Sequence, residues 1–215
     1  MVSTASGAIL LLAAATAVYA APSCTMDQLQ SCQYKFNDAL NIDEPKPWQD
    51  SNPYRSKIEA LYQKPGTGGV RGVCRYFREF KECLGSCYQQ TVSIPFLVMN
   101  AGVKQIEATT YLATFNSLHY LCGAGLGTYM NNVNCFVNSW YDNQQALTDS
   151  RNNFELKAYL NPSAACSLMN NVLSDFEKAF IGRCGVEARD VQFWGCEYAR
   201  TGMFTAYPQC TPSCS

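Results

Sequence analysis

Apolar residues recur at helical spacing along most of this chain, and no stretch shows the strict alternation of a half-buried strand. The pattern therefore predicts an all-α protein, a single disulfide-rich helical domain of about six helices. The principal helices are expected over residues 25–40, 70–90, 105–122, 128–141, 161–184 and 187–202, with a short one over 52–63.

Local signals support several of these boundaries. Thr25 followed by Gln28 has the form of a capping box, in which each side chain bonds the backbone of the other residue. Asn161 and Pro162 are typical of an N-cap and a first helical residue, and Gly185 is a typical C-terminal stop. The tail from about residue 205 is rich in Pro and Ser, so it is expected to be irregular.

The segment CRYFREFKECLGSC, from Cys74 to Cys87, lies in the expected helix over 70–90. With the period of an α-helix, one side of this segment is apolar and the other is charged. Cys74 and Cys83 mark the edges of the apolar side, and Cys87 lies just within it. Side chains one helical turn apart hold their Cβ atoms ~6 Å apart, beyond the ~4 Å of a disulfide. Cys83 and Cys87 should therefore not pair together, and the three cysteines should have three different partners.

Residues 1–20 have the form of a secretory signal peptide, an apolar run followed by Val18-Tyr19-Ala20, with cleavage expected after Ala20. No later segment approaches the ~20 apolar residues of a membrane span, so none is expected. Residues 21–215 then form the single cysteine-rich domain, and the expected localisation is secreted and extracellular.

All twelve cysteines lie beyond that cleavage point, and an even number in an exported chain indicates disulfides rather than free thiols. The sequence leaves their pairing open, although the last two are placed to hold the tail. The expected disulfide cysteines are Cys24, Cys32, Cys74, Cys83, Cys87, Cys122, Cys135, Cys166, Cys184, Cys196, Cys210 and Cys214.

Charge restricts the classes of partner. The 16 basic and 17 acidic residues are interspersed and leave a net charge of −1, so we expect no nucleic-acid binding. Arg71, Arg75 and Arg78 share one helix face that a sulfated polysaccharide could meet, but Glu79 and Glu82 lie among them. The mixture favours an ordinary solvated face.

Signals for chemistry are weak. Cys83 and Cys87 are too few for a zinc site in a chain with one histidine, and no cofactor or metal is expected. That histidine, His119, lies at the helical angle of Leu112 and Phe115 and is expected to be hydrogen-bonded at the edge of the core. Catalysis by two carboxylates stays open, although we expect no acid in an apolar setting that would raise its pKa. The chain is therefore not expected to be an enzyme.

Aromatic residues are plentiful, with 13 Tyr, 11 Phe and 3 Trp. The favoured interpretation is that they fill the core. The alternative is that they line a cavity for a small hydrophobic molecule.

The run Cys74-RYFREFKE-Cys83-LGS-Cys87, with the later HYL-Cys122 and NVN-Cys135-F, resembles the cysteine-rich domain named after chondroitin proteoglycan 4 and related invertebrate secreted families of unknown function. The resemblance covers residues 74–135 well and 166–196 loosely. It implies a non-catalytic extracellular structural, matrix or fluid protein. Chondroitin is attached at Ser-Gly pairs, and the only such pair lies in the expected signal peptide, so this chain is not expected to carry it.

The leading hypothesis is thus a secreted non-catalytic structural or matrix/fluid protein, stabilised by up to six disulfides and meeting an extracellular protein or matrix partner. The first alternative is a carrier of a small hydrophobic ligand. The second is a secreted receptor-directed effector.

Overall fold

The computed structural model describes residues 23–214, so the expected signal peptide over 1–20 lies outside the described residues. All regular structure within this range is helical, which confirms the all-α prediction. Ten α-helical segments are present there, of which α4 is a single turn, against the about six expected. The elements are α1 (Met26–Leu40), α2 (Ser51–Ala60), η1 (Leu61–Gln63), α3 (Gly68–Leu84), η2 (Gly85–Cys87), α4 (Tyr88–Thr91), α5 (Ile94–Ala101), α6 (Gln105–Leu121), α7 (Leu126–Asn131), α8 (Val133–Leu160), η3 (Pro162–Ala164), α9 (Ala165–Cys184) and α10 (Arg189–Phe204), where η marks a 3-10 helix.

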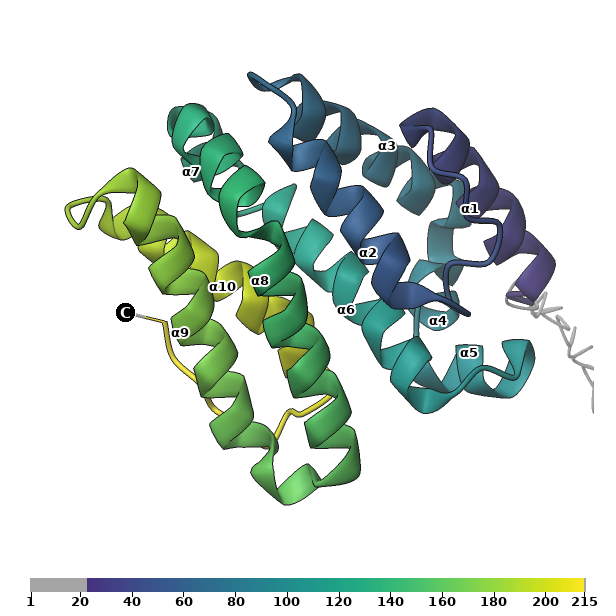
Figure 1. The fold of residues 1–215 in the computed structure, drawn as a ribbon. Helices are drawn as coiled ribbons and strands as arrows, with labels where there is room; N and C mark the ends of the chain where they lie inside the picture. Colours follow the sequence, from purple (N-terminus) through teal and green to yellow (C-terminus); the bar gives the residue numbers. More distant parts are fainter. Residues whose placement is uncertain (1–22, 215) are drawn as a thin grey trace, which may run out of the picture.

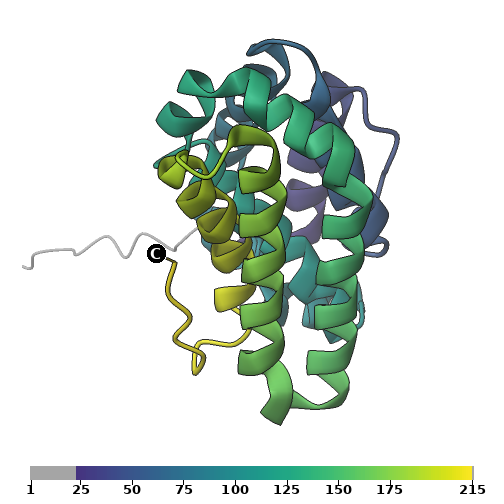
Figure 2. The ribbon, with the colours of Figure 1, turned by 60° about the vertical axis from the view of Figure 1, so that its left-hand side comes forward.

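The helices form two groups that lie side by side (Figure 1). We call α1 to α6, residues 23–122, the N-terminal half, and α7 to α10 with the tail, residues 126–214, the C-terminal half. Figure 2 shows α8, α9 and α10 packed along one another in the C-terminal half. The two halves meet where α6 contacts α10 and where α2 contacts α8, and we call this contact region the seam.

The six disulfides divide between the halves, three in each, and none of these bonds crosses the seam. The three cysteines of CRYFREFKECLGSC have three different partners, as the helical spacing predicts. The pairs are Cys24–Cys87, Cys32–Cys83 and Cys74–Cys122 in the N-terminal half, and Cys135–Cys184, Cys166–Cys210 and Cys196–Cys214 in the C-terminal half. Twelve paired cysteines suit an oxidising compartment.

The prediction of one helix over 70–90 is wrong. Gly85 adopts a positive φ of 54°, which ends α3, and Cys87 lies in the separate turn η2. Up to Leu84 the predicted faces are confirmed: Val73 and Phe77 are buried, whereas Arg71, Arg75 and Arg78 are exposed on the other side of α3.

Other differences have local causes. α8 continues to Leu160 instead of ending near residue 141, because Leu147 and Phe154 extend its buried side through a polar stretch. α5 was not predicted; the Ser93 hydroxyl caps it by accepting a hydrogen bond from the Phe96 N–H (3.4 Å).

The capping box at the start of α1 forms only in part. The Thr25 hydroxyl accepts a hydrogen bond from the Gln28 N–H at 3.2 Å, as predicted. The Gln28 side chain does not return to Thr25 and instead donates to the Leu84 carbonyl at 3.5 Å, which links α1 to α3.

Aromatic rings fill both halves, as the favoured interpretation predicts. In the N-terminal half Phe80 stacks on Phe115 with ring centroids 5.0 Å apart. In the C-terminal half Trp194 stacks on Tyr198 at 5.1 Å, and Trp140 lies edge-on to Tyr198 at 5.4 Å. All five of these side chains are at most 2% exposed.

Candidate functional site

The seam contains two buried ion pairs that join α2 to α8. Arg55 donates to Glu155, with Nη1 2.6 Å from Oε1, and Arg151 donates through both terminal nitrogens to the Glu59 carboxylate. The four side chains are at most 5% exposed. Each helix thus supplies one arginine and, four residues later, one glutamate, and the two Arg-x-x-x-Glu motifs pair crosswise.

Each buried carboxylate has a further hydrogen-bond donor. The Tyr198 hydroxyl donates to Glu59 Oε1 at 2.9 Å, and the Thr110 hydroxyl donates to Glu155 Oε2 at 2.8 Å. Burial by itself would lower the pKa of Arg151, but the charge of Glu59 and its hydrogen bonds outweigh burial and raise it. Paired and hydrogen-bonded in this way, the charges can stay inside the protein.

Two acids, Glu59 and Glu155, are buried, but each faces an arginine and a hydroxyl donor and not an apolar pocket. They do not contradict the expectation that no acid lies in an apolar setting of the kind that raises a carboxyl pKa. Sequence reasoning missed these residues because net charge and single motifs do not show pairing between distant helices. The signal was present as two Arg-x-x-x-Glu motifs, RSKIE and RNNFE, each with an apolar residue directly before its glutamate.

This network is suited to holding the halves together. The arginines already occupy both carboxylates, and the donors come from both halves. Because each glutamate is paired with an arginine, neither is arranged as a free acid or base. Three buried N–H groups, Arg55 Nε, Arg151 Nε and Trp140 Nε1, have no hydrogen-bond acceptor within the described part of the chain.

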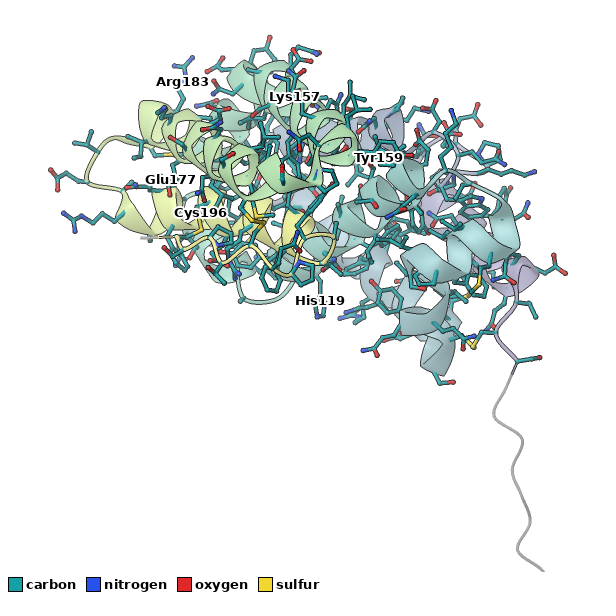
Figure 3. All side chains as sticks on the ribbon, turned by 90° about the horizontal axis from the view of Figure 1, so that it is seen from below. His119, Lys157, Tyr159, Glu177, Arg183 and Cys196 are labelled. Atoms are coloured by element: carbon teal, nitrogen blue, oxygen red, sulfur yellow. A yellow bond between two sulfur atoms is a disulfide. The ribbon has the colours of Figure 1, made fainter. Side chains whose placement is uncertain are left out.

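One end of the seam opens into a cleft of about 320 Å³, which we call the seam cleft. Ile106 and Thr109 of α6 line it from the N-terminal half, and Tyr159 and Tyr207 line it from the C-terminal half. Glu155 reaches it from the buried network. Figure 3 shows Tyr159 near the junction of the two halves.

A second cleft of about 540 Å³ lies over the C-terminal ends of α6 and α10, and we call it the His119 groove. Its lining is mostly apolar and includes Tyr120 and Phe204. Arg200 borders it and is held by Glu197 through hydrogen bonds of 2.8 and 2.6 Å. Figure 3 shows His119 on the opposite side of the molecule from Tyr159, so the two clefts are separate.

The expectation that His119 is a hydrogen-bonded residue at the core edge is wrong. The last turn of α6 buries Leu118 and Leu121 and leaves His119 exposed. Within the described chain its closest characterised contact is with the Phe77 ring, at 6.5 Å between centroids, and no acid is bonded to it. Partial burial and the charge of Lys81 lower the pKa of its imidazole. A triad built on His119 thus lacks its acidic member among residues 23–214.

Among residues 23–214 no group of three or more His, Cys, Asp or Glu side chains is arranged to hold a metal ion. None of the helices described is both long and apolar enough to cross a membrane.

No protein-family model, curated protein or solved structure matches this chain. The resemblance to the chondroitin proteoglycan 4-type domain therefore stays a prediction.

Proposed function

We propose that the protein is a secreted, non-catalytic extracellular protein with a structural, matrix or fluid role. The observation that carries the proposal is the covalent organisation: three disulfides close each half, while a buried ion-pair network joins the halves. Each disulfide constrains the unfolded chain by roughly 2–4 kcal/mol. A chain cross-linked in this way resists unfolding, which suits a protein that stays folded outside the cell more than one that changes conformation.

The candidate catalytic groups support the same proposal. The one histidine has no acid bonded to it among the described residues, and the two most buried glutamates are neutralised by arginines. General acid–base catalysis needs a proton-transferring group that is free to exchange its proton with a substrate.

The test is an activity panel on protein purified from its source. Glycan, lipid, ester and peptide substrates are incubated with the wild-type chain, with His119→Ala and with Glu155→Gln, and products are followed by mass spectrometry. No turnover is expected from any of the three. Turnover by the wild type that either variant abolishes would overturn the non-catalytic role.

A second candidate, a carrier of small hydrophobic molecules, is favoured by the His119 groove. Its apolar lining and volume of about 540 Å³ fall within the range of ordinary ligand sites. Native mass spectrometry of the purified protein tests it: a carrier retains an apolar ligand, and Phe204→Ser in the groove reduces the retained fraction. Protein that carries no ligand, and takes up none from an added lipid extract, excludes this role.

A further inference from the structure

The seam cleft has the construction of a small-molecule site. Ile94 and Ile106 line it from the N-terminal half, and Ala158 and Pro162 line it from the C-terminal half, so each side supplies apolar surface. Gln105, Thr109 and Gln209 add uncharged polar groups. Its volume of about 320 Å³ is at the lower end of the usual range for ligand sites. A molecule bound there contacts both halves at once.

Two tyrosines add aromatic surface to the cleft. Tyr159, one residue before the end of α8, is 51% exposed. Tyr207 in the tail is half-buried, and its ring lies against Phe154 with centroids 5.5 Å apart. Tyrosine faces pack on flat apolar groups and attract organic cations. The aromatic surface therefore fits a ligand with an apolar body and a positive charge.

The lining of the cleft presents one charged group. Among the described residues that line it, Glu155 is the one charged side chain; Arg55, which balances its charge, is not part of the lining. Glu155 and Tyr207 both line the cleft, and burial and then the negative charge of Glu155 raise the pKa of Tyr207. A carboxylate accepts hydrogen bonds and donates none, so it selects a ligand that carries a donor.

We propose that the seam cleft binds a small organic cation, with an aromatic or alkyl body and a protonated amine. The body packs between the isoleucines and Tyr159, and the ammonium group approaches Glu155 and the Tyr207 ring. Charge complementarity favours this occupant over an anion of the same shape, because the cleft presents the Glu155 carboxylate, while the balancing Arg55 guanidinium is outside the lining. The site is independent of the proposed function, since neither a structural role nor a carrier role at the His119 groove requires it.

Three probes of similar shape test the charge preference on the wild-type chain. Calorimetric titration with 2-phenylethylamine, 2-phenylethanol and phenylacetate compares a cation, a neutral donor and an anion. We expect the amine to bind at least about tenfold more tightly than the alcohol, and phenylacetate to bind most weakly. Equal affinities, or tightest binding of phenylacetate, would overturn the proposal.

Variants test the location. Tyr159→Ala, at a half-exposed position, should lower amine affinity by about tenfold. The double variant Arg55→Met with Glu155→Leu removes both charges without leaving either unpaired, and it should abolish the preference for amine over alcohol. His119→Ala, in the other groove, should leave amine affinity unchanged. Loss of binding in His119→Ala with retention in Tyr159→Ala would place the amine elsewhere and overturn the site.

Nuclear magnetic resonance gives an independent readout. Backbone shifts induced by 2-phenylethylamine should cluster at residues 94, 106, 158 and 207, in both halves. Shifts confined to the His119 groove contradict the proposal. A negative result here leaves the non-catalytic role intact, and turnover in the activity panel leaves the amine site intact, so the two failures are distinguishable.

Discussion

Arg151 of α8 and Glu59 of α2 form a fully buried ion pair across the seam, although 92 residues separate them in the chain. Each residue belongs to an Arg-x-x-x-Glu motif whose other member pairs with the opposite helix. Each of these buried charges is stable only while its ion-pair partner is present, so the contact between the halves depends on both members of each pair.

The first prediction concerns removal of one of these charges. Glu59→Gln leaves the Arg151 guanidinium buried without its counter-charge, and we expect a loss of roughly 3–5 kcal/mol in the free energy of unfolding. Urea denaturation followed by tryptophan fluorescence measures it. Glu82→Gln is the control, because Glu82 forms an exposed surface ion pair with Arg78 at 3.9 Å. This variant should change stability by less than about 0.5 kcal/mol.

The double variant Glu59→Leu with Arg151→Met completes the comparison. It leaves no unpaired charge, so it should be more stable than Glu59→Gln. Equal stability of Glu59→Gln and the Glu82→Gln control would show that the buried pair does not hold the seam.

The second prediction follows from the division of the disulfides. A protease site inserted in the exposed Gly123–Ala124 turn separates the halves, and no disulfide links the fragments. The cut protein should run as two bands on a non-reducing denaturing gel, yet elute as one species under native conditions, because the seam holds the fragments together.

A cut in the turn between α9 and α10 provides the matched control. Cleavage beside exposed Val186 leaves the fragments linked by the Cys166–Cys210 disulfide, so a single band should persist until reductant is added. A single non-reduced band after the Gly123–Ala124 cut would contradict the pairing described above.

The third prediction concerns close packing of α10 on α9. A Cβ atom at Gly195 would lie 2.5 Å from Phe180 Cδ2 and 3.1 Å from the Phe176 carbonyl oxygen. Gly195→Ala should therefore lower stability by roughly 1–3 kcal/mol. Gly182→Ala, in α9 with no atom within 4 Å of the added methyl, should raise it by roughly 0.5–1 kcal/mol. Thermal melts that rank the two variants in the opposite order would refute this packing.

The sequence was sufficient for features that depend on neighbouring residues. The all-α class, the faces of α3 and the cap at Thr25 all follow from helical spacing and local hydrogen bonds. The break at Gly85 was missed because a glycine is compatible with either a helix interior or a stop, and only its positive φ decides.

Features that join distant segments required the structure. The crosswise pairing of the Arg-x-x-x-Glu motifs depends on how α2 packs against α8, and helical periodicity alone does not determine that packing. The exposure of His119 likewise depends on which side of the last turn of α6 is covered by other helices. Both clefts are products of this packing.

The last prediction uses the fact that His119 is the only histidine, so its ring protons give a single set of resonances. A proton nuclear magnetic resonance titration should give a midpoint below the ordinary value of about 6.5, because partial burial and then the charge of Lys81 lower the pKa. Lys81→Gln should raise the midpoint part of the way, since burial remains. A midpoint above 6.5 in the wild type would contradict the described environment.

The lowered pKa of His119 also determines whether protonation of this residue raises or lowers the stability of the fold. The unfolded chain binds the proton more readily than the folded chain, so protonation favours unfolding. Well above the unfolded pKa of about 6.5, His119 makes no contribution to the pH dependence of stability. As the pH falls through that value, its contribution lowers the free energy of unfolding, and this loss levels off below the folded pKa. His119→Asn removes this contribution, so between pH 7 and pH 5 the variant should lose less stability than the wild type in parallel urea titrations. An equal or larger loss in the variant would show that the folded protein does not disfavour the protonated imidazole.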